Sequence, residues 1–140
     1  MSMHYPFLFH TQASGAAGLA MALHPADSQL SRSLAISRYS HASSAARLVS
    51  NEIRDLNGAP SDALIMAVLN LGVYAGEVDK IDDQECHPPS PLATVQNLHA
   101  FGRLTLIPSH ARALHALVEK AGGLQAVGSE IRGLEELVQL

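Results

Sequence analysis

The feature that most constrains the fold is an apolar segment, Ala63–Val73, in which Asn70 is the one polar side chain. Its residues are apolar on every side of a helix and rich in Ala, Leu and Met, so we expect a central buried helix rather than a strand. Ser61 can cap this helix by accepting a backbone hydrogen bond, and Asp62 suits its positive N-terminal end. The segment is shorter than the ~18–20 residues of a membrane span, so we expect no membrane helix.

A longer amphipathic helix is predicted before this segment, over Ser28–Leu56. Asp27 or Ser28 can cap its start, and Asn57-Gly58 supplies residue types that tolerate a left-handed end. The serine-rich stretch 40–44 is a candidate break into two helices. Apolar residues three to five positions apart indicate one face of this helix. They are Leu34, Tyr39, Ala42, Ala46, Val49, Ile53 and Leu56.

The N-terminal residues predict a shorter helix from Ser14 to His24. Thr11 or Ser14 can serve as its N-cap, and Pro25 would end it. The first 24 residues lack a basic start and a continuous apolar run, so we expect no secretion signal.

Three more helices are predicted in the second half of the chain. The first runs from Leu92 to Phe101 or Gly102, the second is opened by Pro108-Ser109 and closed by Gly122-Gly123, and the last extends from Ser129 to the terminus. The spacing therefore predicts an all-α fold, a single-domain irregular helical bundle of about five to six helices over residues 1–140. We expect helix in more than half of the residues.

Residues 76–91 are predicted to form an acidic, proline-containing loop. Three prolines and Cys86 occur there, and five acidic residues surround Lys80. At sixteen residues the segment is longer than most connections, which points to disorder or to a functional role.

Charge and cysteine content exclude several classes of protein. Nine Lys and Arg against thirteen Asp and Glu leave a formal net charge of −4, so we expect no direct DNA binding by this chain. A lone cysteine, Cys86, can form neither an intramolecular disulfide nor a four-cysteine zinc site. These properties predict an intracellular protein.

The candidate catalytic and metal-binding residues form no complete site in the sequence. Asp82–His87 contains possible metal ligands, but no second ligand pair follows elsewhere, and His110 and His115 are five positions apart rather than the four typical of a helical zinc pair. Cys86 and His87 are sequence neighbours, which seldom gives the geometry of a catalytic dyad. We therefore expect no catalytic residue, no metal and no cofactor. A small metal-dependent or histidine-based enzyme is the alternative.

A specific pattern of Ser, Pro, Gly and apolar residues starts at Ser90, reading S-P-L-A-T-V-Q-N-L-H-A-F-G and then P-S-H-A-R-A-L-H-A-L-V-E-K-A-G-G-L. It resembles the all-helical regulatory domain of fungal-specific transcription factors that carry a binuclear zinc cluster. Their patterns are S-P-L-x-x-L-Q-W-L-x-x-Y-G and N-P-x-H-x-x-x-L-x-x-L-V-x-x-R-G-G-L. The matching positions are Ser90, Pro91, Leu92, Gln96, Leu98, Gly102, Pro108, His110, Leu114, Leu117, Val118, Gly122, Gly123 and Leu124.

The segment S-D-A-L-I-M-A-V, Ser61–Val68, is also similar to this family, so the resemblance covers about residues 29–128. It implies a nuclear regulatory domain that acts through protein–protein contacts. Asn97 and Ala121 stand where the family often has Trp and Arg, which is typical of a diverged member.

The resemblance does not extend to the family's zinc cluster. That cluster needs six cysteines, and the chain has one. The family's domain also continues for several helices beyond Gly-Gly-Leu, so we expect a shortened form, a truncated paralogue or a fragment. A stand-alone helical adaptor unrelated to transcription is a further alternative.

The predicted C-terminal helix carries an apolar stripe of Ile131, Leu134 and Val138 at i, i+3 and i+7. Mainly charged residues flank it, as on a helix that enters an apolar groove. The stripe therefore predicts a binding surface for a protein partner or for a second copy of the chain. The alternative is that it packs against the chain's own central helix.

Overall fold

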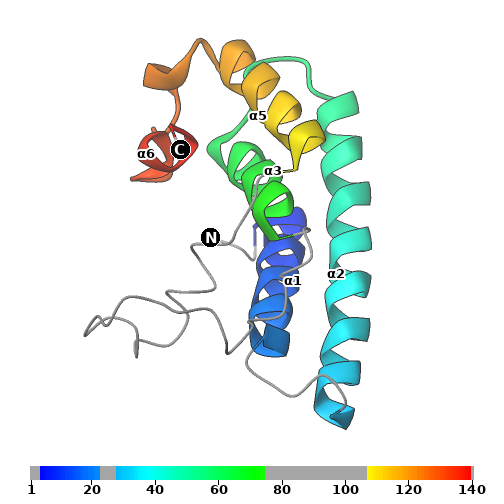
Figure 1. The fold of residues 1–140 in the computed structure, drawn as a ribbon. Coiled ribbons are helices and arrows are strands. Elements are labelled where there is room, and N and C mark those ends of the chain that lie inside the picture. The colour runs from blue at the N-terminus through cyan, green and yellow to red at the C-terminus, as the bar shows by residue number, and fades with distance from the viewer. Residues whose placement is uncertain (1–3, 23–27, 75–106, 140) are drawn as a thin grey trace, which may run out of the picture.

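A computed structural model of the 140-residue chain describes residues 4–22, 28–74 and 107–139. Within these ranges the regular structure is helical throughout and contains no strand, which confirms the all-α prediction (Figure 1). The elements are α1 (Pro6–Ala22), α2 (Gln29–Arg54), α3 (Asp62–Tyr74), α5 (Pro108–Ala121), the short 3-10 helix η1 (Leu124–Ala126) and α6 (Leu134–Val138).

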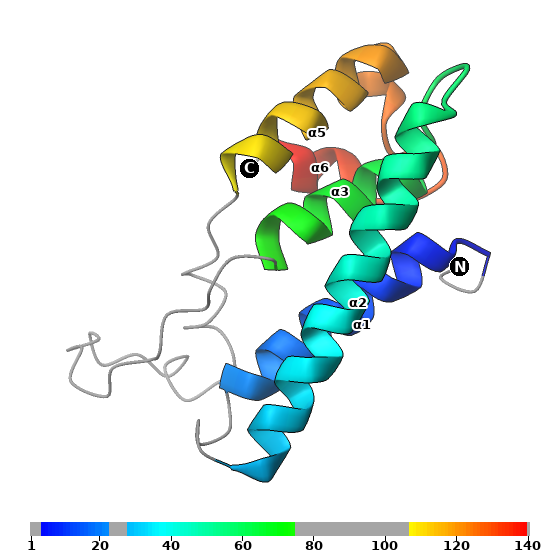
Figure 2. The same cartoon turned by 90° about the vertical axis from the view of Figure 1, so that its right-hand side faces the viewer.

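Helix α3 forms the centre of the fold, as its apolar sequence predicts. It contacts α1, α2, α5 and α6. Six of its residues are buried in the common core: Ala63, Leu64, Ile65, Ala67, Val68 and Leu71. Helices α1 and α2 lie side by side and antiparallel, and α2 forms one edge of the molecule (Figures 1 and 2).

Side chains at the predicted positions cap α2 and α3. Ser28 Oγ accepts a hydrogen bond from Ser31 N at 3.0 Å, and Ser61 Oγ accepts one from Leu64 N at 3.2 Å. Because these hydroxyls bind backbone N–H groups that have no partner within the helix, they fix where each helix begins.

Helix α5 begins and ends where the sequence predicts. Pro108 is its first residue, and Gly122 ends it in a left-handed conformation with a φ of 107°. Ile107 N donates to Gly72 O at 3.1 Å, which ties the start of α5 to the C-terminal half of α3.

Helix α1 begins at Pro6, so the predicted start at Ser14 is wrong. The two predicted N-caps are buried inside the helix. Thr11 Oγ1 donates to Leu8 O at 2.9 Å, and Ser14 Oγ donates to Arg38 O at 3.2 Å. Their hydroxyls therefore bind backbone carbonyls inside α1 and across to α2, instead of capping a helix start. Pro25 lies outside the described residues.

Helix α2 is continuous over 26 residues, so the predicted break at 40–44 is wrong. A serine costs a helix only a few tenths of a kcal/mol, and packing of α1 along α2 offsets that cost. The helix also ends before the predicted Asn57-Gly58. Its C-cap is Asp55, whose φ of −87° is not left-handed.

The predicted helix from Ser129 to the terminus is wrong for its first half. Residues 127–133 form turns in which Gly128 and Gly133 have φ of 92° and 83°, and only Leu134–Val138 is helical. The predicted loop 76–91 and the helix from Leu92 to Phe101 or Gly102 lie outside the described residues. Among the described helices, none is long and apolar enough to cross a membrane.

Candidate functional site

The outer face of α2 carries a straight line of exposed side chains, which we call the α2 stripe. Its members are spaced alternately by four and three positions, so they share one face of the helix. They are Arg32, Ile36, Tyr39, Ser43, Ala46, Ser50 and Ile53, and all seven are exposed. In Figure 2 this edge of the molecule is turned toward the viewer.

Three large apolar side chains of the α2 stripe are open to solvent. Ile36 is 73% exposed, Tyr39 64% and Ile53 38%. The single apolar face predicted for this helix is therefore partly wrong, because Tyr39, Ala46 and Ile53 point away from the core, whereas Val49 is buried in it. Aligned apolar side chains on a surface are typical of an interaction site.

A groove opens beside the α2 stripe, between α2 and α5, and we call it the α2–α5 groove. Val68 and Leu71 of α3 contribute to its lining, and its volume is about 190 Å³. Helix α2 contributes Ala46, Val49, Ser50 and Ile53, and α5 contributes Ser109, His110 and Ala113. Small-molecule pockets usually hold ~300–1,000 Å³, so this groove suits a few apolar side chains of a protein rather than a drug-sized ligand.

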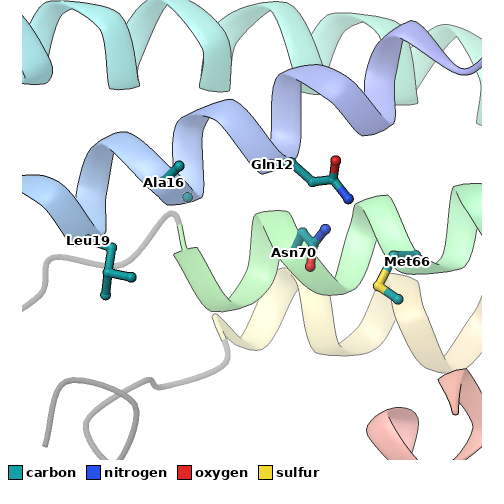
Figure 3. Close-up of a pocket in the computed structure, with 6 residues that line it drawn as sticks. Gln12, Ala16, Leu19, Met66 and Asn70 are labelled. Carbon is teal, nitrogen blue, oxygen red and sulfur yellow. The ribbon is translucent and has the colours of Figure 1, made fainter. Parts of the chain in front are cut away.

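A second pocket, of about 330 Å³, lies between α1 and α3 (Figure 3). Two amide side chains, Gln12 and Asn70, come from the two facing helices. The remaining lining residues are Gly15, Ala16, Leu19 and Met66. None of these six residues can exchange a proton near neutral pH, so the pocket offers amide hydrogen bonds and apolar contact, and no acid–base chemistry of its own.

Helices α1 and α2 also meet through two histidines, His10 and His41, whose Nδ1 atoms are 2.8 Å apart. The ring centroids are 5.0 Å apart. The distance between the ring centroids exceeds the Nδ1–Nδ1 distance by almost twice the distance from a ring centroid to its own nitrogen. The two Nδ1 atoms therefore lie nearly on the line between the ring centroids and point at each other. One Nδ1–H therefore donates to the other Nδ1, and the lone pairs do not converge on a metal ion.

Acid is expected to weaken the contact between α1 and α2. Burial, the facing His41 and the nearby Arg47 lower the pKa of His10 below 6.5. Since His10 then binds fewer protons in the folded than in the unfolded state, its contribution to stability is present above pH ~6.5 and is lost as the pH falls through the folded pKa. Thermal melts from pH 8 to pH 5 should show this loss. His10→Gln should flatten this pH dependence relative to the original chain.

Asp62 binds the turn that precedes α6. Its buried carboxylate accepts hydrogen bonds from Gly128 N at 3.0 Å, Glu130 N at 2.7 Å and Ile131 N at 3.0 Å. Burial alone would raise the pKa of Asp62, but these three backbone N–H groups outweigh it and hold the pKa below 3.8. Asp62 thus fixes the C-terminal turn, a role that its position at a helix start does not reveal.

The C-terminal stripe predicted as a partner surface lies against the chain's own core. Leu134 is fully buried, and Ile131 and Val138 pack against the same cluster. This agrees with the alternative prediction, in which the stripe packs against the chain's own core instead of a partner. Leu134 is therefore not available on the surface of the folded chain, and Ile131 and Val138 are only partly exposed.

The residues that carry the family resemblance are only partly described. Pro108 starts α5, His110 lines the α2–α5 groove and Leu114 is buried in the core. Gly122 and Gly123 have positive φ, and Leu124 begins η1. Those outside the described residues are Ser90, Pro91, Leu92, Gln96, Leu98 and Gly102.

The two candidate catalytic histidines, His110 and His115, have different surroundings. His110 lines the α2–α5 groove, whereas the side chain of His115 is 76% exposed and lies 3.7 Å from Glu119. In the described part of the chain, no three His, Cys, Asp or Glu residues come together as metal ligands. Asp82–His87 lies outside that part.

Comparison of the chain with models of protein families, with curated proteins and with solved structures gives no match in any of the three.

Proposed function

We propose that this chain is a helical protein-interaction module of the type found in the regulatory domains of fungal binuclear zinc-cluster transcription factors. It acts through protein contacts in the nucleus, not through catalysis. The observation that carries this proposal is the α2 stripe, on which Ile36 and Tyr39 are exposed and Ile53 lines the α2–α5 groove.

Three further observations support this proposal. The groove is too small for a typical small-molecule ligand and is lined mostly by apolar side chains, which suits the side chains of a protein. His110, one of the residues that carry the family resemblance, also lines it. The 140 residues contain a single cysteine, so a six-cysteine zinc cluster is not among them, and the interaction surface would act on a protein rather than on DNA.

A tethering experiment tests this function. The chain is fused to an unrelated DNA-binding domain and directed to a reporter promoter. We expect the fusion to change reporter expression several-fold relative to the DNA-binding domain alone, because a regulatory module recruits its partners wherever it is placed. An unchanged reporter, with the fusion folded and present at equal level, would contradict the proposal and favour an adaptor unrelated to transcription.

A further inference from the structure

Most of the charges around the α2 stripe are positive. Helix α2 contains four Arg and one acidic residue, Glu52, so it carries a formal charge of +3 in a chain whose net charge is −4. Arg32 belongs to the stripe, and Arg47 and Arg54 each follow a stripe residue by one position and are exposed. Glu52 precedes Ile53 by one position, so it flanks the stripe on the side of the helix opposite to Arg54. The exposed face of α2 is therefore basic as well as apolar.

The α5 side of the α2–α5 groove adds another cation near the end of α2. Lys120 is spaced from Ser109 and Ala113 so that the three residues share one face of α5. Lys120 Nζ donates to Leu56 O at 3.1 Å, which holds it beside the segment that follows α2. The acidic Glu119 is instead 3.7 Å from His115.

We infer that the α2 stripe and the α2–α5 groove bind an acidic amphipathic helix of a partner protein. The stripe extends over ~33 Å at ~1.5 Å per residue, which matches a partner helix of about three heptads. Apolar side chains of that helix would contact Ile36 and Tyr39 and enter the groove beside Ile53. Its flanking carboxylates would lie opposite Arg32, Arg47 and Arg54. This inference rests on the proposed function and specifies its partner.

The same charges argue against the two other occupants. A second copy of the chain would bring three Arg against the same three Arg, which like-charge repulsion disfavours. A nucleic acid would match the Arg residues but would leave Ile36 and Tyr39 in contact with a charged backbone. An acidic helix satisfies both the charge and the apolar side chains.

Two synthetic peptides test the inference directly. Both have about 21 residues with Leu at the heptad contact positions, and they differ in carrying Glu or Lys at the flanking positions. The repulsion between Glu side chains keeps the acidic peptide from pairing with itself. By fluorescence anisotropy we expect the Glu peptide to bind in the micromolar range and the Lys peptide at least about tenfold more weakly. Raising the salt concentration from ~0.05 to ~0.5 M should weaken the Glu peptide about tenfold.

Variants of α2 locate the binding surface. Ile36→Glu should weaken the Glu peptide at least about tenfold by removing an apolar contact and adding a like charge. Leu30→Glu is the matched control, because Leu30 is also an exposed apolar residue of α2, at 50%, but lies off the stripe, and its change should alter affinity less than about twofold. Both variants should keep the helical circular dichroism of the original chain.

Several results would overturn the inference. They are equal binding of the two peptides, equal effects of the two variants, competition by a DNA duplex that Ile36→Glu does not affect, and self-association of the chain through the stripe at concentrations below those that bind the peptide. If one of these occurs while the tethered chain still changes reporter expression, the acidic partner is wrong and the proposed function stands. If the reporter also fails to respond, both are wrong.

Discussion

Replacing Asp62 with Ala is expected to lower the free energy of unfolding by about 2–4 kcal/mol, because three backbone N–H groups lose a charged acceptor at once. The groups belong to Gly128, Glu130 and Ile131, in the turn that leads into α6. Asp62→Asn should cost less, since its amide oxygen can take the place of Oδ2 and accept from Glu130 and Ile131. Urea denaturation followed by circular dichroism measures both variants.

The control for this prediction is Asp55→Ala. It removes an exposed aspartate at the C-terminal end of α2 and should change the free energy of unfolding by less than ~0.5 kcal/mol. Asp62 should also contribute to the decrease in the free energy of unfolding at low pH. Since its folded pKa is held below 3.8, its contribution is present above the unfolded pKa and is lost as the pH falls through the folded value. Equal losses for the Asp55 and Asp62 variants would show that the three hydrogen bonds contribute nothing particular.

Leu134→Asp is expected to unfold the C-terminal part of the core, and Leu134→Ala to cost about 2–5 kcal/mol, a large share of the ~5–15 kcal/mol of an ordinary domain. Leu134 is fully buried, so the aspartate would be a buried charge without a partner. Leu137→Asp is the matched control, because Leu137 lies on the same helix and is 44% exposed. Thermal melts of the three variants should separate them clearly.

The outcome of Leu134→Asp also decides what the C-terminal stripe does. A variant that stays folded with unchanged melting, but loses contact with another protein, would contradict the burial of Leu134 in the chain's own core. Loss of folding with Leu137→Asp unaffected is the result that the structure predicts.

Local signals were sufficient for the helices whose ends are fixed by adjacent residues. Helix α3 follows from an apolar run after Ser61, and the start and end of α5 follow from Pro108 and Gly122. In each case the residue that starts or ends the helix lies at that end of it in the sequence, so the sequence pattern is enough to predict the position.

The sequence was insufficient where the deciding partner is distant. Asp62 accepts hydrogen bonds from Gly128, Glu130 and Ile131, which follow it in the sequence by 66, 68 and 69 positions. Those bonds hold a turn where the sequence predicts a helix from Ser129. Ser14 Oγ donates to a carbonyl of α2 that is 24 positions away, so a serine that looks like a cap in the sequence lies inside a helix. Such contacts exist only once the helices are packed.

The candidate site was hidden for a related reason. Apolar spacing in α2 does not distinguish the side that faces the core from the side that faces solvent, because α2 has apolar residues on both. Val49 is buried, whereas Tyr39 and Ile53, which belong to the same predicted face, are exposed, and Ile53 lines a groove that α5 completes. Among the described residues, Ile36 is the most exposed large apolar residue, and it lies outside that predicted face.

Two single variants, compared in the tethering experiment, test whether the α2 stripe is the contact surface. Ile36→Glu changes the α2 stripe, and Leu30→Glu makes the same chemical change on the same helix away from it. If the α2 stripe is the contact surface, the fusion with Ile36→Glu loses its effect on the reporter, whereas the fusion with Leu30→Glu keeps it. An Ile36→Glu fusion that is folded and as active as the original chain would show that the α2 stripe is not the contact surface.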